Sequence, residues 1–207
     1  MAVRDALLVL LSMGPAYGFA LHGGLAERTG GRRTVNVGQT YATLDRLTKQ
    51  GLIEPAGSTD DGLPLHRLTA GGRAASTAWL EGADAAGADP WDETVDRVLI
   101  AHSLPRFDAA SVIEAELLRW RARRDDAHPR ADAVDSAAGP IDLLAARAAA
   151  AEIVRADGAI SWLESARDAS GLEYEPSMDR PRRGRRPGRS LDAGASADAG
   201  PQESAAP

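Results

Sequence analysis

The chain has 207 residues, of which 43% are hydrophobic and 26% charged, a composition typical of one or two globular domains. It has no cysteine, which excludes disulfides, thiolate metal sites and thiol catalysis, and no apolar run approaches the roughly 20 residues that span a bilayer. The net charge of −6 comes from the middle of the chain, because residues 1–80 and 180–207 each carry an excess of Lys and Arg; a nucleic-acid partner is therefore not excluded.

The first third of the chain predicts two helices. Residues 3–13 place apolar side chains on one helical face, and Gly14-Pro15 ends that helix. Its run LLVLL could suggest a signal peptide, but the Arg4-Asp5 pair and the lack of a small-residue cleavage pattern favour a buried helix in a soluble, cytoplasmic protein. Residues 17–27 predict a second helix, which Gly30-Gly31 ends.

A third helix and a hairpin are predicted next. Asn36 and Gln39 have the spacing of a capping box, which starts a helix over residues 36–50, and Gly51 suits the position after its end. A wing over residues 52–68 is expected from two short strands, 52–58 and 63–68, around a turn that contains Gly62.

The end of this region predicts one more helix. Pro64 places the second strand at a sheet edge or delays its start, because proline has no N–H to donate. Thr69 is expected to cap a fourth helix that reaches about Glu81. Three helices, a hairpin and a helix are the order of a winged helix-turn-helix, in which the third helix enters the major groove of DNA.

The second half of the chain predicts only helices. The small, acidic stretch 82–90 is the expected domain boundary, and helices are predicted at 91–103, 108–126 and 140–170. In the last of these, six residues recur at alternating spacings of three and four, as in an a/d seam that packs on another helix or another subunit. They are Ala146, Ala149, Ile153, Ala156, Ile160 and Leu163. The alternative is an amphipathic core helix of a monomer.

The predicted fold class is therefore mainly α. It comprises a winged helix-turn-helix DNA-binding domain with a two-stranded wing at 1–82, an all-α dimerisation or effector domain at 90–172, and a disordered tail at 176–207. The tail opens with the arginine run 180–189, which either enters the minor groove or attracts DNA weakly as a solvated segment.

Three separated motifs resemble the N-terminal domain of PadR-family transcriptional regulators. They are LLVLLSMGPAYGFAL, GQTYATLDRLTKQGLIE and HRLTAGGRA, and together they cover about residues 3–80. Two less specific pieces, DRVLIAHSLP and AISWLESARD, are similar to the longer PadR members, whose C-terminal helices form an intertwined dimer. The resemblance implies DNA binding and an antiparallel-helix homodimer. Tyr41 matches the recognition-helix tyrosine that reaches the DNA backbone in relatives.

Ten residues are candidates for contact with double-stranded DNA, either at phosphates or at base edges. They are Tyr17, Asn36, Gln39, Thr40, Tyr41, Thr43, Arg46, Lys49, His66 and Arg67. For Tyr41 the alternative is packing in the core, and for Gln39 and Thr43 it is a solvated face. Val37 departs from the family pattern in replacing a common proline, and Leu65-His66 in replacing an aromatic pair.

These observations predict a homodimeric repressor that binds an inverted repeat. The alternative function is a protein interaction module that uses the C-terminal seam, with the winged helix as scaffold. Catalytic residues, metal ligands and cofactors are not expected, because the four histidines are scattered and no phosphate-binding glycine loop follows a strand. If a small-molecule effector exists, Trp91, Trp120 and Trp162 could line its pocket, although aromatic packing in the core is the other use of these residues.

Overall fold

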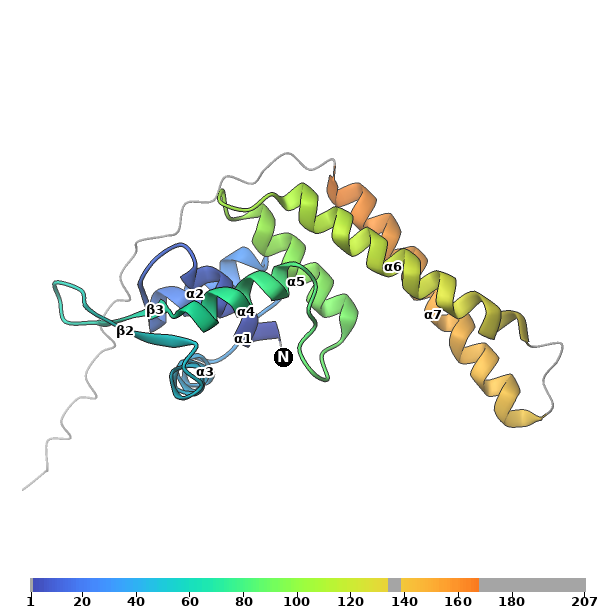
Figure 1. The fold of residues 1–207 in the computed structure, drawn as a ribbon, viewed down its shortest axis with the longest axis horizontal. Helices are drawn as coiled ribbons and strands as arrows, with labels where there is room; N and C mark the ends of the chain where they lie inside the picture. The colour runs from blue at the N-terminus through green and yellow to red at the C-terminus, as the bar shows by residue number, and fades with distance from the viewer. Residues whose placement is uncertain (1, 134–138, 168–207) are drawn as a thin grey trace, which may run out of the picture.

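The structure is a computed structural model that describes residues 2–133 and 139–167, so the predicted tail lies outside the described residues. The described part is mainly helical, with a small antiparallel sheet among the first four helices and a long helical hairpin projecting from them (Figure 1). The predicted fold class is confirmed for these residues. The helices are α1 Ala2–Leu11, α2 Gly18–Arg28, α3 Val37–Lys49, α4 Ala70–Leu80, α5 Pro90–His102, α6 Ala109–Asp132 and α7 Pro140–Arg167, and the strands are β1 Ala16–Tyr17, β2 Ile53–Ser58 and β3 Pro64–Leu68.

Helix α1 forms the centre of the first core. Its residues Ala6 to Leu11 are all buried, because α2, α4 and α5 pack around it. A helix that is apolar on nearly every side is suited to such a central position. The run LLVLL is therefore part of a folded core, as the sequence predicts.

Helix α3 begins and ends as the sequence predicts. The Asn36 side chain accepts a hydrogen bond from the Gln39 N–H at 2.8 Å, and the Gln39 side chain accepts one from the Asn36 N–H at 3.2 Å. At the other end, Gly51 adopts a positive φ of 68°, and the N–H of Leu52 reaches back to the carbonyl of Leu47 at 3.0 Å. The capping box and the glycine stop fix both ends of this helix.

The sheet has one strand more than the predicted wing. Strand β1 pairs with β3, so β3 lies between β1 and β2 and is not an edge strand. Of the two alternatives predicted from Pro64, the late start is the one found, because β3 begins at Pro64 and not at Leu63. Pro64 is the first residue of β3, and β1 pairs only with the next two residues, Leu65 and His66. The missing N–H therefore removes no bond to β1, which explains why a central strand tolerates this proline.

Helices α6 and α7 form the projecting antiparallel hairpin (Figure 1). The sequence predicts that α6 ends near residue 126, but the helix continues through Pro129 to Asp132. Packing along α7 offsets the cost of this proline, and Ala127 beside it is fully buried.

The six seam residues of α7 lie within this hairpin. Five of them are buried in the single chain, and Ile153 is partly buried. The seam therefore packs on another helix, as predicted, but that helix is α6 of the same chain. This corrects the prediction that these side chains form the surface offered to a second subunit. The last three residues of the predicted helix 140–170 lie outside the described residues.

Helix α5 belongs to both parts of the molecule. Ile100 packs in the first core, whereas Val98 and Ala101 pack in a second core with α6 and α7. A boundary at residues 82–90 therefore separates elements along the chain but does not separate two cores. The division into a DNA-binding and a helical domain stays a prediction.

A buried ionic cluster joins the two parts where α4, α5 and α6 meet. Arg97 is 1% exposed and donates hydrogen bonds of 2.6 Å each to the Trp79 carbonyl, Glu116 and Asp84. The Trp79 indole N–H donates to Glu93, which is also buried. Because several groups satisfy the charges of Arg97 and Glu116, this cluster ties the last turn of α4 firmly to α5 and α6.

Candidate nucleic-acid interface

Helix α3 presents a distinct outer face. Thr40, Thr43, Leu44 and Leu47 are its buried residues, so a helical period of 3.6 places one row directly opposite them. That row consists of Gly38, Ala42, Asp45 and Lys49, all of which are exposed. Gly38 and Ala42 carry little or no side chain, which allows another surface to approach the helix backbone closely. The sequence reading missed these two residues, although the spacing of Leu44 and Leu47 points to them.

Thr40 and Thr43 are not available for contact with DNA, which corrects two of the predicted site residues. Thr40 is fully buried, and its hydroxyl lies 3.1 Å from His22 Nδ1 on α2. Thr43 is 7% exposed and donates to the carbonyl of Gln39 at 2.8 Å. A threonine can bury its methyl group and satisfy its hydroxyl within the protein, so its polarity alone does not place it on the surface.

Tyr41 flanks the outer row, and a glycine on α2 makes room for its ring. A Cβ atom on Gly18 would lie 2.7 Å from Tyr41 Cε1, too close for any larger residue unless the ring moves. Tyr41 is 46% exposed, so its ring packs on one side while its other side faces solvent. Tyr17, another predicted contact, precedes Gly18 and is partly buried in β1.

Gln39 and Arg46 flank the outer row on the other side. The Gln39 side-chain oxygen is used in the capping box, which leaves its amide N–H groups available as donors. Arg46 is exposed, and its guanidinium donates to the Ala42 carbonyl and the Thr43 hydroxyl at 3.2 and 3.1 Å. Lys49, at the end of the row, pairs with Asp45 at 2.7 Å. The charge on this face is therefore only partly positive.

Of the two predicted contacts on the wing, only Arg67 carries a positive charge. Burial lowers the pKa of His66, and its Nδ1 has no hydrogen-bond partner among the described residues. His66 is therefore neutral at pH 7, so the wing contact that the sequence predicts at this residue has no positive charge to offer. The Arg67 side chain is 58% exposed and pairs with Glu54 on β2 at 2.8 Å.

The remaining predicted contact, Asn36, serves the helix itself. It is exposed, but its side-chain oxygen is occupied by the capping bond to Gln39. Six of the ten predicted contacts, on α3, its cap and the wing, are exposed and can be reached by a ligand. These residues are Asn36, Gln39, Tyr41, Arg46, Lys49 and Arg67.

The comparison with protein families gives one match. Residues 7–78, which run from within α1 to within α4 and include the wing, match the transcriptional regulator PadR-like family. Residues 7–78 are therefore a PadR-like domain. This domain contains the winged helix and the candidate interface described above. The matched family consists of transcriptional regulators.

Solved structures similar to most of this chain include a PadR protein of Bacillus subtilis. Bacillus subtilis PadR in complex with operator DNA is 23% identical, with a TM-score of 0.36, and the match covers 78% of this chain and 94% of that one. The same protein in complex with p-coumaric acid gives 23% identity, a TM-score of 0.35, and coverage of 80% and 96%. The protein smu.1604c of Streptococcus mutans UA159 is 18% identical with a TM-score of 0.34, and the match covers 78% of this chain and 96% of that one. No curated protein matches the chain.

Metal sites and membrane-spanning helices are both absent from the described residues. Within residues 2–133 and 139–167, no group of three or more His, Asp or Glu side chains is arranged to hold a metal ion. No helix in those two ranges is both long enough and apolar enough to cross a membrane. The tryptophans Trp91, Trp120 and Trp162 pack against one another, with the Trp91 ring 6.2 and 5.2 Å from the other two. Their main role in this structure is packing in the second core.

Proposed function

We propose that this protein is a homodimeric repressor that binds an inverted repeat in double-stranded DNA through α3 and the wing. The observation that carries the proposal is the outer face of α3, where Gly38 and Ala42 leave the backbone open between larger polar side chains. Such a face suits close approach to base pairs in the major groove, which admits one α-helix. A solvated face of an ordinary surface helix has no need of small residues at its centre.

Each side chain around that face has a role that follows from its position. The Tyr41 hydroxyl and the Arg46 guanidinium reach phosphates on the two sides of the groove, and Arg67 reaches the flanking backbone from the wing. The Gln39 amide donates to base edges at the start of the helix. Phosphate contacts supply affinity that falls with salt concentration, whereas Gln39 supplies sequence preference.

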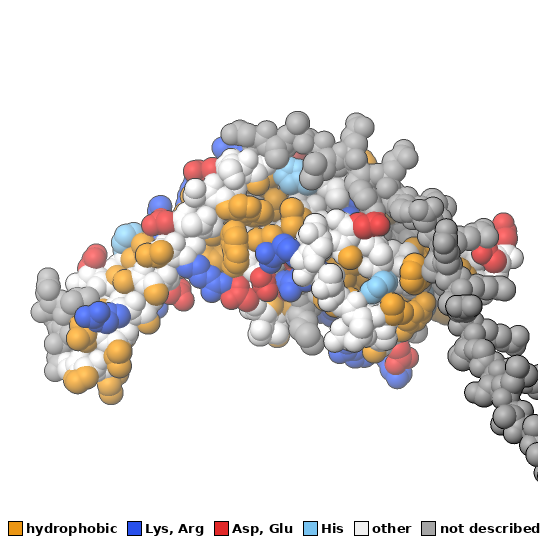
Figure 2. Space-filling view, turned by 180° about the vertical axis from the view of Figure 1, so that it is seen from behind, with side chains coloured by type: hydrophobic (Ala, Val, Ile, Leu, Met, Phe, Trp, Pro, Cys, Tyr) orange, Lys and Arg blue, Asp and Glu red, His pale blue; other side chains and the backbone are white. Residues whose placement is uncertain are grey.

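The helical hairpin provides the dimer contact in this proposal. Because the α7 seam is buried against α6, a second copy must use another face of the hairpin. Four large apolar side chains are exposed on α6 and α7, and Figure 2 shows hydrophobic side chains at the surface of the hairpin. They are Leu118 at 66%, Ile141 at 81%, Leu144 at 66% and Val154 at 72%. Burying them stabilises a dimer by the hydrophobic effect.

A two-fold dimer presents two α3 helices related by the same axis. It therefore prefers two half-sites in inverted orientation, separated by about one turn of DNA, roughly 34–36 Å. Occupying such a site at a promoter excludes the transcription machinery, which is the simplest route to repression.

Selection of bound fragments from genomic DNA by the purified full chain tests this proposal. We expect enrichment of one inverted repeat, and a mass in solution that corresponds to two chains. Failure to enrich any repeat contradicts the proposal and favours the alternative, a protein interaction module. Ile141→Glu with Leu144→Glu should give a monomer with weaker DNA binding, and an unchanged dimer would contradict the assigned contact surface.

Gln39 allows a sharper test of base reading. Gln39→Glu keeps an oxygen that accepts the capping bond from Asn36, but it removes the amide donor and adds a negative charge. We expect this variant to fold as stably as the parent and to lose its preference for the selected repeat. Lys49→Gln is the matched control on the same helix, and it should weaken binding to all sequences alike while reducing the salt slope by about one.

A further inference from the structure

Among the thirteen residues of α3, all of which the structure describes, Asp45 is the one acid. It lies in the outer row of the helix with Gly38, Ala42 and Lys49, on the face that we assign to DNA. The phosphates of an approaching duplex repel a carboxylate, so Asp45 opposes the attraction that the cationic residues of this face provide. A position in the middle of a nucleic-acid interface therefore calls for a hydrogen-bond donor that the DNA supplies.

Asp45 contributes little to the stability of α3. Its carboxylate accepts a hydrogen bond from Lys49 at 2.7 Å, and the two side chains are 61% and 73% exposed. Water screens a pair as exposed as this one, and glutamate would form it with a better helix former than aspartate. Pairing within the protein thus does not account for an aspartate at this position, and its replacement should leave the fold intact.

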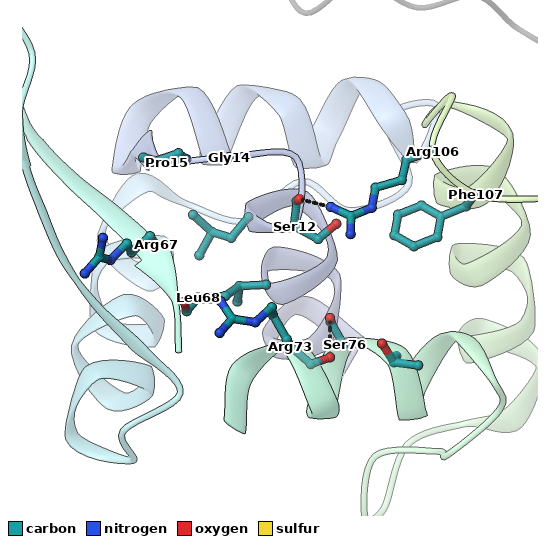
Figure 3. Close-up of a pocket in the computed structure, with 11 residues that line it drawn as sticks. Ser12, Gly14, Pro15, Arg67, Leu68, Arg73, Ser76, Arg106 and Phe107 are labelled. Carbon is teal, nitrogen blue, oxygen red and sulfur yellow. Dashed lines mark hydrogen bonds between the residues drawn. The ribbon is translucent and has the colours of Figure 1, made fainter. Parts of the chain in front are cut away.

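Cationic side chains are available to hold the DNA backbone elsewhere on this surface. Arg46 follows Asp45 on α3 and is exposed. On the wing, Arg67 points outward from β3, away from a pocket of about 380 Å³ that it lines together with Arg73 and Arg106 (Figure 3). Because Arg46 and Arg67 can contact phosphates, the Asp45 carboxylate is left to face the base edges in the groove.

The residues that precede Asp45 in the outer row let its short side chain reach a base. A single CH2 group separates an aspartate carboxylate from the backbone, so the helix must approach the base pairs closely for contact. Ala42 and Gly38 lie about one and two turns earlier in the row, and both are exposed. Neither side chain holds the helix backbone away from the groove, so the small residues and the carboxylate form one surface.

We propose that Asp45 reads a cytosine in each half-site by accepting a hydrogen bond from the cytosine N4 amino group. In the major groove only cytosine and adenine present an amine, whereas guanine and thymine present acceptors that repel a carboxylate. Adenine also carries the acceptor N7 beside its amine, and cytosine carries no acceptor on its own major-groove edge. Cytosine therefore satisfies Asp45 without a second, unfavourable contact. This assignment rests on the proposed DNA-binding function and adds the identity of one base to it.

Asp45 and Gln39 read different base pairs. Asp45 comes six residues after Gln39, which is about 9 Å along the helix axis. Successive base pairs are about 3.4 Å apart, so the cytosine lies about two or three base pairs from the base that Gln39 contacts. Lys49 keeps its role at a phosphate, because its ammonium group has three donors and can hold Asp45 and a phosphate oxygen together.

Selection from random DNA fragments by the full chain and its variants tests this assignment. For the parent we expect a repeat with one C·G pair fixed in each half-site. Asp45→Asn should select A·T at that position, because an asparagine amide matches adenine N6 and N7, and should leave the other positions unchanged. Asp45→Ala should select no base there. Asp126→Asn, the same change at an exposed residue of α6, is the matched control and should select the parent's repeat.

Affinity measurements give the size of the effect. Changing that C·G pair to T·A in one half-site should weaken binding of the parent about tenfold, which is typical of one lost base contact. The same DNA change should alter the affinity of Asp45→Ala by less than about twofold, since the contact is already absent. Combining the protein change with the base change isolates this one contact from general effects of either change.

The failure of this assignment can be told apart from the failure of the proposed function. A parent half-site without a fixed C·G pair, an unchanged preference in Asp45→Asn, or equal weakening of the parent and Asp45→Ala by the T·A change would overturn the assignment while DNA binding stands. Enrichment of no repeat by the parent instead overturns the proposed function, and the assignment with it.

Discussion

Arg97→Met removes the central charge of the ionic cluster between α4, α5 and α6 while keeping an unbranched side chain. The change leaves Glu116, Asp84 and the Trp79 carbonyl without the donor that each now has at 2.6 Å. Glu116 is nine-tenths or more buried, so its charge cannot be solvated without opening the fold. Loss of one partner from a buried ion pair costs about 3–5 kcal/mol of stability when the remaining charge is left uncompensated. Glu116 keeps its pair with Arg119 at 2.6 Å, so we expect the lower end of this range, about 3 kcal/mol.

Urea unfolding, followed by circular dichroism, measures this cost. With an m-value of about 2–3 kcal/mol/M, the midpoint should fall by about 1–2 M. The matched control is Arg121→Met on α6, whose exposed pair with Glu164 at 3.3 Å should contribute less than about 1 kcal/mol. A loss below about 1 kcal/mol for Arg97→Met, or equal losses for both variants, would refute the assignment of Arg97 as the tie between the two parts.

Three further predictions concern pH, the place of Tyr41 and a helix cap. Burial alone raises the pKa of Glu116, but the bond from Arg119 and the charge of Arg97 outweigh it and hold the pKa below its usual value. The stability that Glu116 contributes is therefore present above pH 4.5 and is lost as the pH falls below it. In a series of urea midpoints against pH, Glu116→Gln should reduce the fall in stability at acid pH. Gly18→Ala should displace the Tyr41 ring, cost about 1–3 kcal/mol and weaken DNA binding, whereas Gly23→Ala on the same helix meets nothing within 4 Å and should be neutral or stabilising in thermal melts. Asn36→Ala should lose about 1 kcal/mol in urea unfolding, and an unchanged midpoint would show that the capping box does not stabilise α3.

The sequence predicts those features of the fold that short-range chemistry determines. The capping box of Asn36 and Gln39, the glycine at position 51 and the cap at Thr69 each depend on residues a few positions apart, and all three are found in the structure. Strand β1 was not predicted because it has only two residues, too few for an alternating pattern. Its existence depends on β3, a partner about fifty residues away in the chain.

The candidate site was predicted less well, because side-chain chemistry does not by itself give exposure. The hydroxyls of Thr40 and Thr43 predict contact with DNA, yet both residues are buried, and His22 and the Gln39 carbonyl are the partners of those hydroxyls. Gly38 and Ala42 have no polar side chain, so residue chemistry does not predict them as contacts, although their position opposite Leu44 and Leu47 follows from helical geometry alone. The pocket at Arg73 and Arg106 could not be predicted, since its walls come from segments that only the fold brings together.

The sharing of α5 between two cores determines how this protein can be divided and recombined. A fragment cut at residues 82–90 would leave α1 without Ile100 and Leu104, and would leave the Trp79 indole and carbonyl without Glu93 and Arg97. The carbonyl of Ser103, just after α5, also accepts a hydrogen bond from Arg28 on α2. A chimera of two such regulators that exchanges the winged helix would therefore keep a complete core only if α5 is transferred together with it. The junction would then lie in the turn before α6.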